Sequence, residues 1–174
     1  MQAEKVPFER PSADAAHLER VPGGRSPVTR AMVTRDQPAS PRDPRLVELP
    51  IFPDDRGVLT FGEYGDHLPF IPKRYYVIMD VPGGKTRGGH AHSRYHSFLV
   101  CLKGSCHIAL DNGQKVWEYR LDSPRKGLYV PPMHFNRLSE FSSDAVLLSL
   151  SSGLYDRSEY VLAYDEFTRR VNRG

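Results

Sequence analysis

Short β-prone runs recur along this chain from Arg45 onward, and turn residues separate almost every run from the next. The runs occupy residues 46–51, 58–61, 74–81, 96–102, 105–110, 115–121, 127–130 and 145–151. Turn sequences such as Pro82-Gly83-Gly84 and Asp111-Asn112-Gly113 lie between them. Many short strands joined by Gly and Asn turns predict an all-β fold, either a barrel or a sandwich. Only residues 164–172 look helical, with two acidic residues in the first turn, where carboxylates suit the helix dipole.

The 174 residues suit one domain with a real core and some excess chain. Residues 1–44 contain seven prolines, many charges and a single aromatic residue, Phe8. Such a segment cannot bury enough apolar surface to offset its ordering entropy. We therefore expect residues 1–44 to be a disordered or loosely docked extension, with a short helix possible over 13–20. Residues 45–174 form the predicted domain.

The overall charge and the absence of long apolar runs exclude several classes of function. The formal net charge is only +3, with no dense Lys/Arg run, so a nucleic-acid partner is not expected. No apolar stretch approaches the roughly 20 residues that span a bilayer. Charges within Met1–Arg10 occupy the place of a signal-peptide core, which predicts a cytoplasmic protein. Cys101 and Cys106 flank Lys103-Gly104 in what reads as a hairpin, and we expect free buried thiols there.

The segment Arg87-Gly88-Gly89-His90-Ala91-His92 carries the clearest chemical signal. Side chains alternate across a strand, so two histidines at positions i and i+2 point to the same face. If this segment lines a barrel, both imidazoles look into one cavity a few ångströms apart. An imidazole titrates near neutral pH, so such a pair can transfer protons or help to hold a divalent metal.

The spacing of these histidines resembles the first motif of the cupin superfamily, and Pro131–Asn136 corresponds to the second. This resemblance implies a cupin-type, jelly-roll-like β-barrel with a short C-terminal helix. Metal-dependent cupins bind their metal through two His, one Glu and a final His. Here His96 or Ser97 stands at the acidic position and Asn136 at the last one, so no metal is expected. A metal-dependent enzyme using His90, His92 and His96 or His134 remains the alternative.

Longer stretches resemble the sugar nucleotide 3,4-ketoisomerases, which are cupins acting on dTDP-4-keto-6-deoxyglucose. The resemblance includes residues 87–106 and extends over 55–59, 72–76, 121–124, 141–148, 154–160 and 164–167. It covers about residues 46–170, the whole predicted domain. Members commonly have Trp-His where this chain has Phe135-Asn136. Asparagine can donate and accept hydrogen bonds, but it cannot act as a general acid or base.

The family resemblance implies roles for individual residues. A 3,4-ketoisomerase moves a carbonyl from C4 to C3 of the hexose through an enediol, which needs proton transfer but no metal or cofactor. His90 is the candidate carbon acid–base and His92 its partner, although the two roles could be reversed. Arg87 is the candidate ligand of the pyrophosphate, because guanidinium binds phosphate oxygens in pairs. Arg74 and Tyr76 alternate onto one strand face, where both could contact the substrate. The alternative is a salt bridge at the pocket rim for Arg74 and a ring packed in the core for Tyr76.

His96 and Asn136 complete the set of candidate substrate-binding residues, with a packed barrel residue as the alternative reading of His96. The resemblance also implies a homodimer, often with exchanged N-terminal strands, that binds a dTDP-linked 4-keto-6-deoxyhexose. A non-catalytic sugar nucleotide binding module is the second alternative. A 3,5-epimerase is a related one, which would exchange a proton at C5.

Overall fold

The computed structural model describes residues 42–173. Nearly all of the predicted N-terminal extension, including its possible helix over 13–20, lies outside these residues. Within them no helix is long and apolar enough to cross a membrane.

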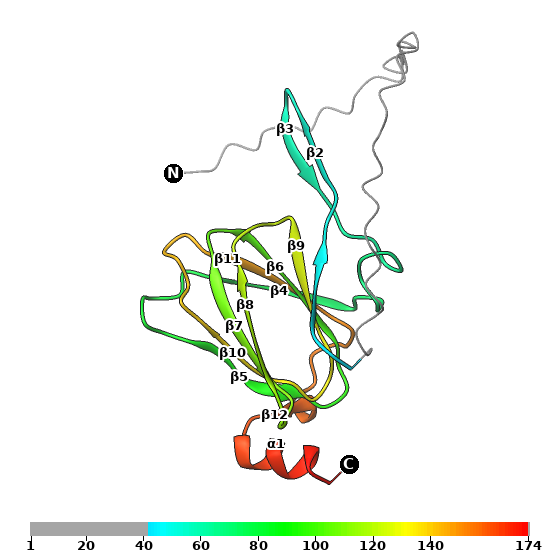
Figure 1. The fold of residues 1–174 in the computed structure, drawn as a ribbon, viewed down its shortest axis with the longest axis vertical. Coiled ribbons are helices and arrows are strands. Elements are labelled where there is room, and N and C mark those ends of the chain that lie inside the picture. The colour runs from blue at the N-terminus through cyan, green and yellow to red at the C-terminus, as the bar shows by residue number, and fades with distance from the viewer. Residues whose placement is uncertain (1–41, 174) are drawn as a thin grey trace, which may run out of the picture. The chain divides into compact units, whose positions relative to one another are not determined.

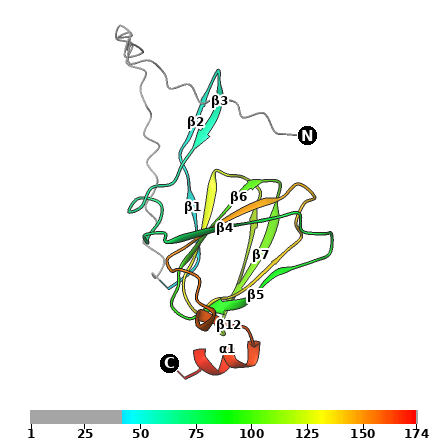
Figure 2. The same ribbon diagram turned by 180° about the vertical axis from the view of Figure 1, so that it is seen from behind.

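Two five-stranded antiparallel sheets face each other (Figures 1 and 2). The strands of the first sheet, in spatial order, are β1 (Arg45–Glu48), β9 (Lys126–Val130), β6 (Ser97–Lys103), β11 (Val146–Ser151) and β4 (Arg74–Met79). Those of the second are β12 (Tyr160–Val161), β5 (Arg87–His92), β10 (Phe135–Ser139), β7 (Cys106–Asp111) and β8 (Val116–Leu121). This confirms the predicted all-β, jelly-roll-like fold, built as two facing sheets.

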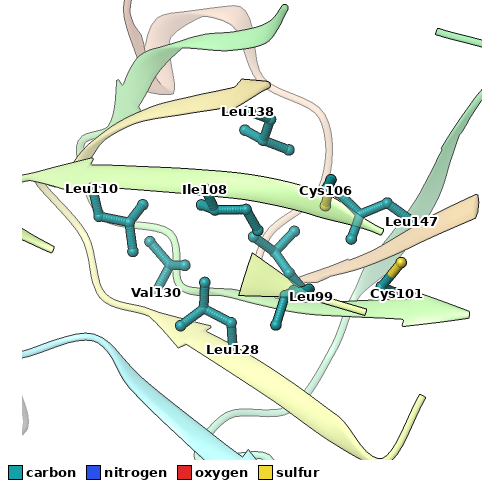
Figure 3. Packing of buried hydrophobic residues seen from close by; sticks show 10 residues of the cluster. Leu99, Cys101, Cys106, Ile108, Leu110, Leu128, Val130, Leu138 and Leu147 are labelled. Atoms are coloured by element: carbon teal, nitrogen blue, oxygen red, sulfur yellow. The ribbon is translucent and has the colours of Figure 1, made fainter. Parts of the chain in front are cut away.

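The inner faces of the two sheets share one apolar core (Figure 3). Leu99, Leu128 and Leu147 come from the first sheet, and Ile108 and Leu110 from the second. All five side chains are buried, because alternate residues of each strand point inward. This packing holds the pocket-lining strands β5 and β10 against the rest of the molecule.

The turn after β6 does not form the predicted hairpin. β6 pairs with β9 and β11, whereas β7 pairs with β8 and β10, so Lys103-Gly104-Ser105 carries the chain from one sheet to the other. Cys101 and Cys106 are free and fully buried, and they face the core from opposite sheets (Figure 3). A short Gly turn looks the same in sequence whether it joins paired strands or facing sheets.

A separate hairpin precedes β4. It consists of β2 (Ile51–Asp54) and β3 (Gly57–Thr60), which pair only with each other among the described residues. The predicted single strand over 46–51 is therefore wrong: it breaks at Leu49-Pro50 into β1 and the start of β2. Proline has no N–H to continue a ladder, which explains the break.

The chain ends in η1 (Arg157–Glu159), β12 and helix α1 (Tyr164–Val171). The predicted helix over 164–172 is confirmed to within one residue. Phe167 on this helix is fully buried against Ala91 of β5 and Val161 of β12. The helix therefore packs behind the strand that carries the two histidines.

Candidate active site

The two histidines of β5 lie side by side, as the sequence predicted. A bulge shifts the register between β5 and β10, with Asn136 opposite His90 and Arg137 opposite Gly88. Gly88 and Gly89 take positive φ angles of 81° and 74°, which glycine adopts without strain. Beyond the bulge the imidazole rings of His90 and His92 are 4.9 Å apart, centroid to centroid, and nearly perpendicular.

Both rings line a pocket between the two sheets. Its polar lining comes from Tyr76, His90, His92, Tyr95, Ser97, His134 and Asn136. Apolar side chains such as Leu99, Val130 and Leu138 complete the wall. A concave, mostly apolar space with a few convergent polar groups is typical of a small-molecule site.

Burial keeps both imidazoles neutral. It lowers the pKa of His90 below its usual 6.5, because the charged ring loses solvation. The pKa of His92 falls to about 4, chiefly through burial, further because a charged His92 ring would repel a charged His90 ring, and also through the positive charge of Arg74. The Nδ1 atom of His92 is buried and has no hydrogen-bond partner within residues 42–173. The pocket thus presents two uncharged proton acceptors at neutral pH.

Tyr160 covers both histidine rings, and sequence reasoning did not single it out. Tyr160 is paired with His92 in the antiparallel β5–β12 ladder. Its ring centroid lies 4.8 Å from that of His90 and 4.6 Å from that of His92. Arg74 donates a hydrogen bond from Nη2 to the Tyr160 hydroxyl, at 3.3 Å. The sequence signal was weak, because Tyr160 lies about 70 residues away in a two-residue strand.

A buried carboxylate fixes the segment that carries Tyr160. Glu159 is 1% exposed and accepts hydrogen bonds from the Nε atom of Arg94 at 2.6 Å and from its backbone N–H at 3.0 Å. The backbone N–H of Ser93 donates to the Glu159 carbonyl at 2.8 Å. These contacts tie η1 and β12 to the chain immediately after His92.

Arg74 and Tyr76 lie next to the histidine pair. The guanidinium of Arg74 sits over the rings of Tyr76 and Tyr155, 5.5 and 5.6 Å from their centroids. Tyr76 lines the pocket, and burial raises the pKa of its hydroxyl, so the phenol stays protonated. Neither Arg74 nor Tyr160, to which it donates a hydrogen bond, is part of the pocket lining.

The other three predicted substrate-binding residues fall in different places. Asn136 lines the pocket opposite His90, and its Oδ1 is buried with no hydrogen-bond partner in the described part of the chain. Arg87 begins β5 with an exposed side chain and lies outside the lining. His96 also lies outside it: its ring packs against Phe70 and Tyr129, and its Nδ1 lies 2.8 Å from the Tyr129 hydroxyl.

The metal-dependent alternative finds no ligand set in this geometry. Among residues 42–173 no three His, Cys, Asp or Glu side chains are grouped so that they could hold a metal ion. His96 is not among the pocket-lining residues, and Asn136 supplies an amide where a metal-binding cupin has an imidazole.

Comparison with known proteins identifies the family. The family model described as FdtA (WxcM-like, C-terminal) matches residues 42–172. This chain belongs to the FdtA family. A relative from Aneurinibacillus thermoaerophilus is named TDP-4-oxo-6-deoxy-alpha-D-glucose-3,4-oxoisomerase. It is 43% identical to this chain over 118 residues, which are 68% of this chain and 85% of the relative.

Solved structures with the same fold agree with the FdtA assignment. A 3,4-ketoisomerase from Helicobacter canadensis has a TM-score of 0.72 and 35% identity, covering 75% of this chain and 98% of its own. A mutant of the 3,4-ketoisomerase QdtA from Thermoanaerobacterium thermosaccharolyticum, in complex with TDP-4-keto-6-deoxyglucose, also has a TM-score of 0.72. It is 32% identical and covers 75% of this chain and 94% of its own. The predicted family resemblance is confirmed.

Proposed function

We propose that this chain is a 3,4-ketoisomerase acting on a dTDP-linked 4-keto-6-deoxyhexose. The observation that carries the proposal is a pair of neutral imidazoles, 4.9 Å apart, on the wall of a pocket in a member of the FdtA family. The reaction needs three proton transfers, removal from C3, return to C4 and one between the oxygens, and neutral imidazole performs such transfers near pH 7.

The chemistry follows from the substrate's own carbonyl. The C4 ketone acidifies the C3–H bond, so His90 removes that proton and the electron pair forms the enediol. The proton on the C3 oxygen moves to the C4 oxygen, and a proton is returned to C4, leaving the carbonyl at C3. No electrons enter or leave, so the balance needs no redox cofactor.

The low pKa of His92 favours His90 as the carbon base. A ring whose pKa is about 4, as in His92, holds a proton poorly near pH 7. It serves better as a hydrogen-bonding partner that orients the substrate or passes a proton between oxygens. Tyr160, which packs on both rings, limits their rotation and keeps them facing the pocket.

Cationic and phenolic groups near the pocket suit the rest of the substrate. Arg87 is exposed, three residues before His90, and is our candidate for the pyrophosphate. Tyr76 and Asn136 supply a hydroxyl and an amide for the sugar. Arg74 holds Tyr160 in place and adds positive charge beside His92.

A homodimer accounts for a large uncovered apolar surface. Phe52, Val58 and Leu59 of the β2–β3 hairpin are exposed, as are Tyr75 and Met79 of β4. The outer face of the first sheet also carries an apolar groove. A two-stranded hairpin is marginally stable alone, and apolar patches of this kind mark association sites. We propose that a second copy covers this surface by exchanging its N-terminal strands.

Incubation with dTDP-4-keto-6-deoxyglucose and a chelator, followed by proton NMR, tests the proposed reaction. We expect new 3-keto sugar signals that do not depend on added metal. An unchanged spectrum combined with tight dTDP binding would favour the binding-module alternative. Activity that appears only with a divalent metal would favour the metal-dependent alternative, and deuterium incorporation at C5 alone would indicate an epimerase.

A further inference from the structure

A third histidine, His134, lies on the wall of the same pocket, in the turn that leads into β10. It is 5% exposed. Met133 and Phe135, its neighbours in sequence, pack against the buried cluster around Phe167. Because side chains alternate in an extended segment, His134 and Asn136 are directed to the side opposite Phe135, toward the pocket.

The backbone before His134 is held in an unusual conformation. Met133 has a φ of +54°, in the left-handed region that non-glycine residues rarely occupy. Its N–H donates to the carbonyl of His92 at 2.8 Å, which ties this turn to the end of β5. Backbone strain of this kind persists only where surrounding contacts enforce it. Here those contacts fix the direction of His134 relative to the histidine pair.

The imidazole of His134 is held in one tautomer. Its Nδ1 lies 3.0 Å from the carbonyl oxygen of Pro132, which can only accept, so Nδ1 carries the proton. Burial lowers the pKa of the ring, which leaves Nε2 as an uncharged acceptor. That Nε2 is buried and lacks a hydrogen-bond partner anywhere in residues 42–173. An unpaired buried acceptor is costly, and a ligand that donates a hydrogen bond to it removes the cost.

We propose that His134 is a third imidazole of the active pocket, whose Nε2 accepts a hydrogen bond from a hydroxyl of the bound sugar. This inference rests on the proposed function, because it requires a sugar in the pocket. Sugar hydroxyls are the abundant donors of such a substrate. Besides His134, the pocket wall offers the acceptor Oδ1 of Asn136, the histidine pair and the hydroxyls of Tyr76, Tyr95 and Ser97, which can also donate. His134 thereby fixes how the hexose ring is presented to His90 and His92.

Two substitutions separate this role from a structural one. His134→Asn keeps an N–H at the position of Nδ1, and so keeps the bond to Pro132, but has no atom at the position of Nε2. His134→Gln instead extends an amide oxygen to that position. Thermal melting and dTDP binding by calorimetry report whether each variant is folded.

The measurement is the gain in affinity that the sugar adds, taken as the ratio of the dissociation constants of dTDP and dTDP-6-deoxyglucose. This sugar nucleotide lacks the ketone and does not react. We expect His134→Asn to bind dTDP like the wild type. The ratio of the two dissociation constants should fall about tenfold in this variant. His134→Gln should recover most of it, and kcat/KM should follow the same order.

The proposal is overturned if His134→Asn retains the full contribution of the sugar, or if the wild type gains nothing from it. Equal losses in the Asn and Gln variants would also contradict an acceptor role. An equal loss of affinity for dTDP and for the sugar nucleotide would contradict it too, because it would show that His134 only maintains the shape of the pocket. Failure of the wild type to convert the keto sugar would instead count against the proposed function. The binding ratio still tests His134 in that case.

Discussion

At the scale of single residues, the site depends on imidazoles that burial keeps uncharged. The pKa of His90 lies below 6.5 and that of His92 is about 4, so both rings take up a proton at lower pH than a free imidazole does. A base works only while unprotonated. We therefore expect the acid limb of the kcat/KM profile to be centred below pH 6.5. A pH profile of kcat/KM checks this, and an acid limb centred above pH 6.5 would contradict it.

Tyr160 provides a second prediction at this scale. Tyr160→Phe removes the hydroxyl that accepts from Arg74 but keeps the ring on His90 and His92. One hydrogen bond contributes about 1 kcal/mol, so we expect about a fivefold fall in kcat/KM. Tyr160→Ala also removes the ring and should reduce kcat/KM further. Wild-type kinetics in the Ala variant would show that Tyr160 does not position the histidines.

At the scale of elements, the bulge in β5 places the two histidines, and two adjacent glycines test it. Both have positive φ, but a Cβ on Gly88 would lie 2.2 Å from Oδ1 of Asn136 and 2.9 Å from its backbone oxygen, whereas nothing lies within 4 Å of one on Gly89. Gly89→Ala should therefore cost only the backbone strain, about 1 kcal/mol of unfolding free energy.

Gly88→Ala adds the collision with Asn136 to that strain, and we expect a loss of at least about 3 kcal/mol together with reduced turnover. Urea denaturation of the two variants measures the difference. If both glycines tolerated alanine equally well, the bulge would not be the feature that shapes the pocket.

The sequence predicted most elements but missed two that build the site. β10 reads Phe-Asn-Arg-Leu-Ser, which has few β-branched residues and no regular alternation of apolar and polar side chains. β12 has only two residues and forms by pairing with β5. Their positions depend on tertiary contacts, so local patterns could not reveal them.

The histidine pair was predictable because its spacing of two residues fixes a shared face. Tyr160 was not singled out from the sequence, and His134 was named only as a ligand of the metal-dependent alternative. Each is placed by contacts with distant segments: Tyr160 by the ladder to His92, and the turn before His134 by the Met133 hydrogen bond to the His92 carbonyl. Arg87 and His96 show the opposite case, since they lie close to the motif in sequence but outside the pocket lining.

At the scale of the whole molecule, the exposed apolar hairpin predicts association. Leu59 on β3 is 62% exposed, and the hairpin pairs with no other strand among the described residues. We expect the wild type to be a dimer by light scattering and Leu59→Glu to shift it toward monomer, because burying an unpaired carboxylate is costly. Val116→Glu, on the edge strand β8 of the other sheet, is the matched control. A monomeric wild type would contradict the proposed exchange of N-terminal strands.

The central claim, that His90 is the carbon base of a ketoisomerase, is tested most directly by His90→Asn. Turnover of dTDP-4-keto-6-deoxyglucose by NMR and dTDP affinity by calorimetry are measured on the same preparation, with His107→Asn as a control outside the pocket lining. We predict that turnover falls by about 10²–10⁴-fold while dTDP affinity stays within about threefold. Retained turnover, or a loss of nucleotide binding with intact chemistry, would contradict the claim.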